Sequence, residues 1–189
     1  GAMKGRNREI PEGSPFKVAW WYRNEFSIPA DYQGKHTWLQ FHSINYKANV
    51  WVNGKLVADT TTVEGAYRLF NLDISKEALP GEKNCLALEI FPPKGMDLTI
   101  TWVDWNPTTP DRGMGIWYDV SIHSTGVVAI ENPFVVTKLN LPSTDQAKLT
   151  ITTELKNTEQ KQVTGILKGN IENIAFSQEV TLGAGETKL

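Results

Sequence analysis

The chain has 189 residues, of which 40% are hydrophobic and 21% are charged, and its formal net charge at pH 7 is −2. This length accommodates one large domain or two small ones, each with its own core, and the composition is that of an ordinary globular protein. A nucleic-acid partner is not expected, because phosphate binding needs a clustered basic surface. The sequence contains no run of 18 apolar residues and therefore predicts no membrane partner.

The residues that bind metals and cofactors are sparse. A single cysteine, Cys85, excludes an internal disulfide and any CxxC metal site. Its apolar surroundings predict a small buried thiol rather than a reactive one. The three histidines are scattered and form neither an HxxH nor an HExxH motif, and no GxSxG motif is present. We therefore expect no metal and no cofactor, and we assign no catalytic residue.

The first structured elements are predicted to be strands. Residues 1–15, which open on Gly1-Ala2-Met3, are interpreted as a tag remnant and an N-terminal arm. Residues 20–28 alternate between apolar and polar side chains, the pattern of a half-buried strand, and Pro29 ends it. Residues 37–44 follow as a second strand with period-two alternation.

A hairpin is the next predicted element. Asn53-Gly54 is a strong signal for a tight turn, and residues 49–52 and 55–58 are its strands. Residues 75–79 are predicted to form one capped helical turn, which Pro80-Gly81 ends. Further strands are predicted at 85–91, 98–103 and 116–124. This succession of short strands is typical of an antiparallel sandwich of the jelly-roll type.

The composition changes near Gly126, which indicates a second unit. After Pro133 the chain contains no Trp or Tyr, and residues 148–155 alternate between apolar and polar side chains. Residues 157–160 form a polar turn, and two further strands are expected at 165–171 and 174–182. The strand count is low for an immunoglobulin-like sandwich of about 100 residues, so this unit is interpreted as truncated.

The segment 102–120 is the strongest candidate for a binding loop. It joins two predicted strands through a long stretch with two prolines, and such loops are uncommon unless they are functional or disordered. Trp105 offers a flat face on which a sugar ring can stack, and Asp104 and Asp111 can accept hydrogen bonds from hydroxyl groups. The residue types equally allow Asp104 to cap a turn and Trp105 to fill the end of the sandwich.

Several segments resemble glycoside hydrolases of family 2. Residues 102–120 are similar to the WVDWNP…GxW-x-DV segment of exo-β-glucosaminidases and, more loosely, to the corresponding segments of β-mannosidases and β-galactosidases. Residues 20–26 resemble the WWYR-x-F strand of the family, 50–54 its V-W-x-NG hairpin, and 65–74 its G-x-x-x-F…D(I/V) step. Tyr118 departs from the pattern, because relatives usually have Arg before Asp-Val.

The resemblance implies an all-β chain with a galactose-binding-like jelly roll at 16–126 and a truncated immunoglobulin-like β-sandwich at 127–189. It also implies a (β/α)₈ barrel with two catalytic glutamates, which needs about 250 residues and is missing from this chain. The missing barrel of the same protein is therefore an expected partner, and the chain alone is expected to be inactive.

The resemblance also assigns a candidate sugar subsite. By the match, Asp104 binds a hydroxyl group of the terminal β-linked sugar and Trp105 forms a wall of the pocket. Asp111 and Trp117 are further candidates, although the predicted strand position of Trp117 equally suits a core residue. Because the family's catalytic carboxylates lie on the barrel, neither aspartate is given that role.

Three functions remain open on the sequence. The chain can be the inactive front part of an exo-acting glycosidase, a stand-alone carbohydrate-binding module, or a structural or adhesive pair of β-sandwiches. The first is favoured on the resemblance, and burial of Trp105 would favour the third. Membership of a family that is often exported implies a periplasmic or extracellular location.

Overall fold

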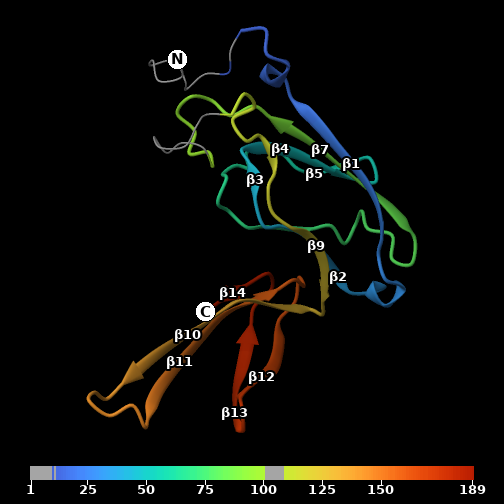
Figure 1. Ribbon diagram of the computed structural model, residues 1–189. Coiled ribbons are helices and arrows are strands. Elements are labelled where there is room, and N and C mark those ends of the chain that lie inside the picture. Colours follow the sequence, from blue (N-terminus) through green and yellow to red (C-terminus); the bar gives the residue numbers. More distant parts are fainter. Residues whose placement is uncertain (1–9, 11, 101–108) are drawn as a thin grey trace. The chain divides into compact units, whose positions relative to one another are not determined.

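The computed structural model of the chain describes residue 10, residues 12–100 and residues 109–189 (Figure 1). The chain forms two compact units, Gly1–Ser124 and Thr125–Leu189. The described elements are antiparallel strands and two short 3₁₀ turns, η1 (Pro15–Lys17) and η2 (Ala30–Tyr32), so the predicted all-β class is confirmed. No helix among these residues is long and apolar enough to cross a membrane.

The first unit is built from two layers of strands. One layer is a four-stranded sheet of order β1-β7-β4-β5, and the other contains the sheet β6-β2-β9 and the pair β3-β8. The bounds of these strands are β1 Trp20–Ser27, β2 His36–Phe41, β3 Ile44–Asn45, β4 Lys47–Val52, β5 Lys55–Ala58, β6 Phe70–Asp73, β7 Lys83–Phe91, β8 Gly115–Ile116 and β9 Val120–Thr125.

A single apolar core joins the two layers. Alternate residues of β4 and β7 point into it, and strands β2, β3 and β6 contribute from the other side. Phe41, Ile44 and Val50 have no exposed surface. The period-two alternation predicted from the sequence therefore corresponds to the inward and outward faces of these strands.

The two predicted turns are present in the first unit. Asn53 and Gly54 both have positive φ angles, 49° and 78°, as a tight two-residue hairpin turn requires. The amide of Ala78 donates to the carbonyl of Ile74 at 2.8 Å, which closes the single helical turn expected near residues 75–79. Both turns were predictable because each rests on local residue chemistry.

Strand β1 differs from the prediction of a half-buried strand. It lies at the edge of its sheet, and seven of its eight residues are exposed. Tyr22, expected on the buried face, is 42% exposed. Periodicity identifies the two faces of a strand but carries no information about its position in the sheet, which explains the error.

The end of the first unit also differs from the prediction. The expected strand 116–124 is interrupted, because β8 ends at Ile116 and β9 begins at Val120. Residues 98–100 are not in a strand, and the rest of the predicted strand 98–103 lies outside the described residues. Cys85, predicted to be buried, is only half-buried because it lies on the outer side of β7.

The second unit contains two smaller antiparallel sheets. One has the order β10-β11-β14 and the other is the hairpin β12-β13. Their bounds are β10 Val128–Leu139, β11 Ala147–Asn157, β12 Val163–Ile171, β13 Ile174–Leu182 and β14 Thr187–Lys188. The strands predicted in this half of the chain are therefore confirmed, and β10 and β14 are additional.

Candidate functional site

The loop that carries two of the predicted site residues is fixed at its base by Asn45. In the pair β3-β8, Ile44 lies opposite Ile116 and Asn45 opposite Gly115. Asn45 is completely buried, and its Nδ2 donates to the carbonyl oxygens of Arg112 at 3.0 Å and Gly113 at 2.8 Å. One buried amide therefore satisfies two backbone acceptors and holds the loop against the end of the sandwich.

Two glycines in this loop are required by geometry. Gly113 and Gly115 have φ angles of 67° and 146°, in the region that L side chains rarely adopt. A Cβ atom on Gly115 would lie 2.7 Å from the hydroxyl oxygen of Tyr22. The chain can therefore pass this close to β1 only because position 115 has no side chain.

Asp111 uses one carboxylate oxygen within the loop. Its Oδ1 accepts a hydrogen bond from the amide of Gly113 at 2.9 Å, and its backbone oxygen accepts one from the amide of Met114 at 3.1 Å. These bonds close a turn over residues 111–114. The role predicted from the sequence, in which Asp111 binds a sugar hydroxyl, stays a prediction, and the observed contacts of Oδ1 are structural.

Trp117 is neither in a strand nor in the core. It follows β8, and 39% of its surface is exposed. Its indole Nε1 donates to the carbonyl oxygen of Ala66 at 2.9 Å, and the hydroxyl of Ser43 donates to the same oxygen. The ring is therefore held in a defined orientation, with its only donor occupied.

Trp117 belongs to a group of four aromatic side chains. Tyr67 and Tyr118 meet it edge to face, with ring centroids 5.6 Å and 5.8 Å away and interplanar angles of 81° and 75°. His42 stacks on Tyr118 at 6.0 Å. We call His42, Tyr67, Trp117 and Tyr118 the aromatic cluster. Tyr67 and Tyr118 are 63% and 59% exposed, so the cluster presents aromatic surface to solvent.

The cluster is suited to binding rather than to catalysis. Exposed aromatic faces can stack on apolar faces of a ligand, and the two phenol groups add hydrogen-bonding capacity. Sequence reasoning identified Trp117 but missed Tyr67 and His42, because they come from other loops and no motif links them. Tyr118 occupies the position where the resemblance expected Arg, and in this fold it stacks rather than forming an ion pair.

In the described part of the loop, the side chain of Arg112 is buried. Only 4% of the residue is exposed, and its φ angle is 55°. Burial lowers the pKa of Arg112, whereas the nearby negative charge of Asp97 raises it. Because the ordinary pKa of arginine is far above neutrality, this group remains positively charged at the base of the loop.

Asp104 and Trp105, the two principal residues of the predicted subsite, lie outside the described residues. The structure therefore describes the C-terminal side of the candidate loop, with Asp111 and Trp117. It brings Trp117 into the aromatic cluster and folds Asp111 onto its own turn.

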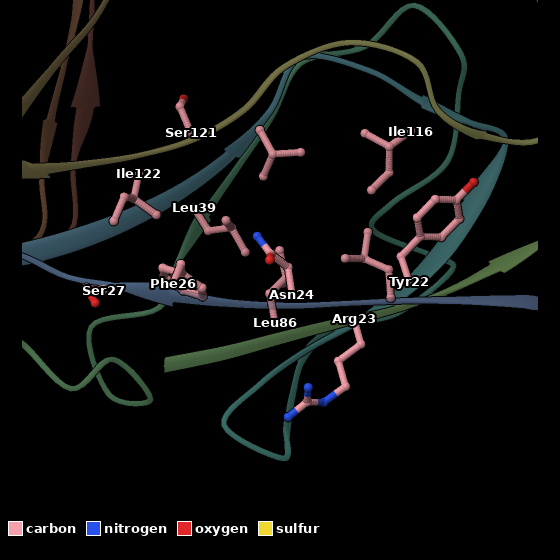
Figure 2. Close-up of a pocket in the computed structure, with 12 residues that line it drawn as sticks. Tyr22, Arg23, Asn24, Phe26, Ser27, Leu39, Leu86, Ile116, Ser121 and Ile122 are labelled. Carbon is pink, nitrogen blue, oxygen red and sulfur yellow. The ribbon is translucent and has the colours of Figure 1, made fainter. Parts of the chain in front are cut away.

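A cavity of about 370 Å³ opens between the edge strands β1 and β9 (Figure 2). Its lining includes the apolar side chains of Leu39, Leu86 and Ile122 and the polar side chains of Asn24 and Ser121. The guanidinium of Arg23 extends away from it (Figure 2). The described lining contains no pair of carboxylates suited to glycoside hydrolysis. Nor do the described residues contain a group of three or more His, Cys, Asp or Glu side chains that could hold a metal ion.

Comparison with known proteins identifies the first unit. The family described as "Glycosyl hydrolase 2 galactose-binding domain-like" matches residues 15–98. The chain contains a galactose-binding-like domain of glycosyl hydrolase family 2. The matched region of this family 2 domain covers β1 to β7, and the resemblance seen in the sequence is thereby confirmed.

The sequence relatives extend the similarity beyond this domain. The chain is 36% identical to the exo-β-D-glucosaminidase of Amycolatopsis orientalis over 183 residues, which cover 96% of this chain and 17% of that protein. It is also 36% identical to the exo-β-D-glucosaminidase of Hypocrea jecorina, covering 92% of this chain and 20% of that protein. The chain thus spans about a fifth of the length of these relatives.

Solved structures show the same relationship. The crystal structure of the exo-chitosanase CsxA of Amycolatopsis orientalis matches with a TM-score of 0.83 at 36% identity, over 92% of this chain and 20% of that one. A family 2 member from Bacteroides cellulosilyticus matches with a TM-score of 0.64 at 27% identity, over 96% of this chain and 25% of that one.

Proposed function

We propose that this chain is the non-catalytic N-terminal part of an exo-β-glucosaminidase-like glycoside hydrolase. The parent protein hydrolyses terminal β-O-glycosidic bonds, and this part supplies scaffold and one wall of the pocket for the terminal sugar. The proposal is supported by 36% identity to exo-β-D-glucosaminidases over almost the whole of this chain.

The structural observation that carries the proposal is the attachment of the candidate loop to the buried side chain of Asn45. Its buried anchor and its two constrained glycines fix residues 112–115 of the segment at the end of the sandwich. A binding wall needs this rigidity, because a misplaced side chain loses most of its contribution to transition-state binding. Asp104 binds a hydroxyl group of the sugar in this account, and Trp105 and Trp117 provide apolar surface.

The catalytic carboxylates in this account belong to a barrel of the same protein, which completes the pocket from the opposite side. A periplasmic or extracellular location is part of the proposal, because polymeric glycans are degraded outside the cytoplasm. The main alternative is a stand-alone carbohydrate-binding module, which the solvent-exposed aromatic cluster also suits.

Titration calorimetry with the monosaccharides glucosamine, mannose and galactose separates the two functions. A single wall leaves most of a sugar ring solvated, so we expect no dissociation constant below about 1 mM. The chain should also fail to hydrolyse p-nitrophenyl β-D-glucosaminide. Sub-millimolar binding of a monosaccharide that is abolished by Trp105→Ala would instead establish a self-sufficient module, and hydrolysis by the chain would refute the non-catalytic assignment.

A further inference from the structure

The outer face of the four-stranded sheet carries two neighbouring tryptophans. Leu88 and Ile90 of β7 point into the core, so the alternate residues Ala87 and Glu89 face outward. In the strand register, Trp21 lies opposite Glu89 and Trp51 opposite Ala87. Opposed residues share a face, and both indoles therefore lie on the outer surface of the first unit.

The two indoles meet across β7 because the residue between them is small. The ring centroids of Trp21 and Trp51 are 5.0 Å apart, and the rings are tilted by 32°. Trp21 is 59% exposed. Leu56 of β5 lies opposite Trp51 and, at 55% exposed, continues the apolar surface to the far edge of the sheet. We call Trp21, Trp51, Asn49 and Glu89 the indole platform.

Glu89 is held in a fixed orientation beside the rings. Its Oε2 accepts a hydrogen bond from Nδ2 of Asn49 at 3.0 Å. The amide of Thr60 donates to Oδ1 of Asn49 at 3.1 Å, which fixes the asparagine in turn. Among the described residues, only Asn49 donates a hydrogen bond to the Glu89 side chain. Its second oxygen is thus available to a donor on a ligand.

The other charged groups on this face are already paired. Arg23 and Lys83 contact the carboxylate of Glu25 at 2.8 Å and 3.3 Å, and these bonds hold the pKa of Glu25 below its ordinary value. Lys47, near the far end of β4, pairs with Glu64 at 2.9 Å. Within the described part of the chain, Glu89 takes part in no ion pair. Its negative charge therefore remains uncompensated beside exposed aromatic surface.

We propose that the indole platform binds an oligosaccharide of β-linked amino sugars. The apolar faces of the sugar rings lie on Trp21 and Trp51, and an ammonium group donates to the free oxygen of Glu89. A carboxylate without an ion pair favours a cationic ligand, and indole faces favour cations and apolar ring faces alike. Two adjacent indoles offer more surface than one sugar ring covers, so an oligomer binds better than a monosaccharide.

This site is separate from the aromatic cluster, which lies on loops rather than on the sheet face, and it goes beyond the proposed function. The proposed wall of the terminal-sugar pocket and the proposed binding at the indole platform can therefore be tested independently. Variants of Trp21 and Glu89 should not alter any contribution that Trp117 makes to a terminal-sugar pocket.

Tryptophan fluorescence titration of the 189-residue chain with the β-1,4-linked hexamer of glucosamine tests the proposal. Trp21→Ala and Glu89→Gln should each weaken binding at least tenfold. The N-acetylated hexamer, which lacks the ammonium groups, should bind at least tenfold more weakly. High salt should weaken binding of the glucosamine hexamer, because an exposed charge pair is screened.

Two control variants make the result specific. Glu179→Gln removes a carboxylate from the second unit and tests for general electrostatic attraction, and Phe134→Ala removes an exposed aromatic ring from the same unit. Both should leave hexamer binding within about twofold. Circular dichroism confirms the fold of each variant, and Glu89→Gln, which preserves side-chain shape, guards against misfolding of the tryptophan variant.

Three outcomes would overturn the proposal. In the first, the folded chain does not bind the glucosamine hexamer. In the second, the hexamer binds the Trp21→Ala and Glu89→Gln variants as well as it binds the unchanged chain. In the third, sedimentation shows that Trp21→Ala abolishes self-association while sugar binding is unchanged. The face would then be a contact between copies of the chain.

Discussion

The two units of the chain differ in how well their strands are covered. In the first unit, two layers meet over a continuous core in which Phe41 and Ile44 have no exposed surface. In the second unit, Phe134 of β10 is 63% exposed, and Ile166 of β12 is 62% exposed. Both units have regular antiparallel strands, but most of the buried apolar side chains belong to the first; the buried hydrophobic residues of the second are Ala129, Leu155 and Leu182.

The difference shows that strand formation and burial have separate causes. Alternation along a segment favours a strand locally, whereas burial requires a second layer that covers its apolar face. A cleft of about 830 Å³ in the second unit is lined by apolar residues that include Leu149, Ile151 and Phe176. The hydrophobic stabilisation of the second unit is accordingly smaller than that of the first, since the free energy gained scales with the apolar area removed from water.

The largest expected effect comes from a matched pair of phenylalanine substitutions. Phe41→Ala should lower the free energy of unfolding of the first unit by about 3–5 kcal/mol, because it opens a cavity in a filled core. Phe134→Ala should change stability by less than about 0.5 kcal/mol, because the side chain is mostly exposed. All seven tryptophans lie before residue 126, so tryptophan fluorescence during urea denaturation reports on the first unit.

Far-UV circular dichroism over the same urea range follows both units and provides the control. Equal losses from Phe41→Ala and Phe134→Ala would contradict the comparison, since they would mean that the second unit buries β10 as thoroughly as the first buries β2.

A second pair of substitutions sharpens the comparison at buried amides. Asn157 of the second unit is 1% exposed and donates from Nδ2 to the carbonyl oxygens of Lys161 and Gly183, both at 2.7 Å. Asn45 has the same arrangement in the first unit. Asn45→Ala should destabilise the first unit by about 2–3 kcal/mol, because two carbonyl groups lose their donor.

Asn157→Ala should leave the fluorescence transition unchanged and increase hydrogen exchange in β11 and β13. If Asn157→Ala moved the fluorescence transition as far as Asn45→Ala does, the units would not be independent in stability.

Alanine substitutions at two glycines should change the free energy of unfolding by smaller amounts, and in opposite directions. Gly115→Ala should cost about 1–3 kcal/mol, because the φ angle is unfavourable for alanine and the new Cβ meets Tyr22. Gly165 in β12 has open space around it and no positive φ, so Gly165→Ala should be neutral or stabilise by up to about 1 kcal/mol. Denaturation followed by fluorescence for the first and by circular dichroism for the second measures both, and a stabilising Gly115→Ala would contradict the account of the loop.

The smallest expected change in stability depends on pH and concerns Asp73, at the end of β6, which pairs with β2. Burial raises the pKa of Asp73, but hydrogen bonds from Ser75 and the nearby His36 outweigh it, so the pKa lies below its ordinary value. A carboxylate whose pKa is lower in the folded state stabilises above its unfolded pKa, and this contribution is lost as the pH falls.

Asp73→Asn should therefore cost about 1 kcal/mol at pH 7 and progressively less below about pH 4, by analogy with other lost side-chain caps. Urea denaturation at both pH values tests this, with Asp145→Asn in the second unit as the control. A penalty that grows on acidification would show that the assigned sign is wrong.

Much of the fold could be predicted because its signals are local. The Asn53-Gly54 turn and the strands 165–171 and 174–182 follow from short-range residue patterns, and the structure contains all of them. The exposure of Tyr22 could not be predicted, because it depends on β1 lying at a sheet edge.

The candidate site was less accessible to prediction. Trp117 was found through the resemblance, but Tyr67 and His42, which complete the aromatic cluster, come from loops far away in the sequence. The role of Asn45 was missed for the same reason, since it binds carbonyl groups of Arg112 and Gly113 across the sandwich end. A residue type indicates what a side chain can do, whereas its partner is decided by the fold.

A chimera tests the proposed function most directly. The segment of the Amycolatopsis orientalis exo-β-D-glucosaminidase that matches this chain is replaced by this chain, and kcat/KM is measured with p-nitrophenyl β-D-glucosaminide. We expect activity in the chimera and a loss of about 10–100-fold in kcat/KM from Asp104→Ala or Trp117→Ala, with Asp145→Asn unchanged. A folded, active chimera whose kcat/KM is unaffected by both substitutions would contradict the claim that this chain forms a wall of the sugar pocket.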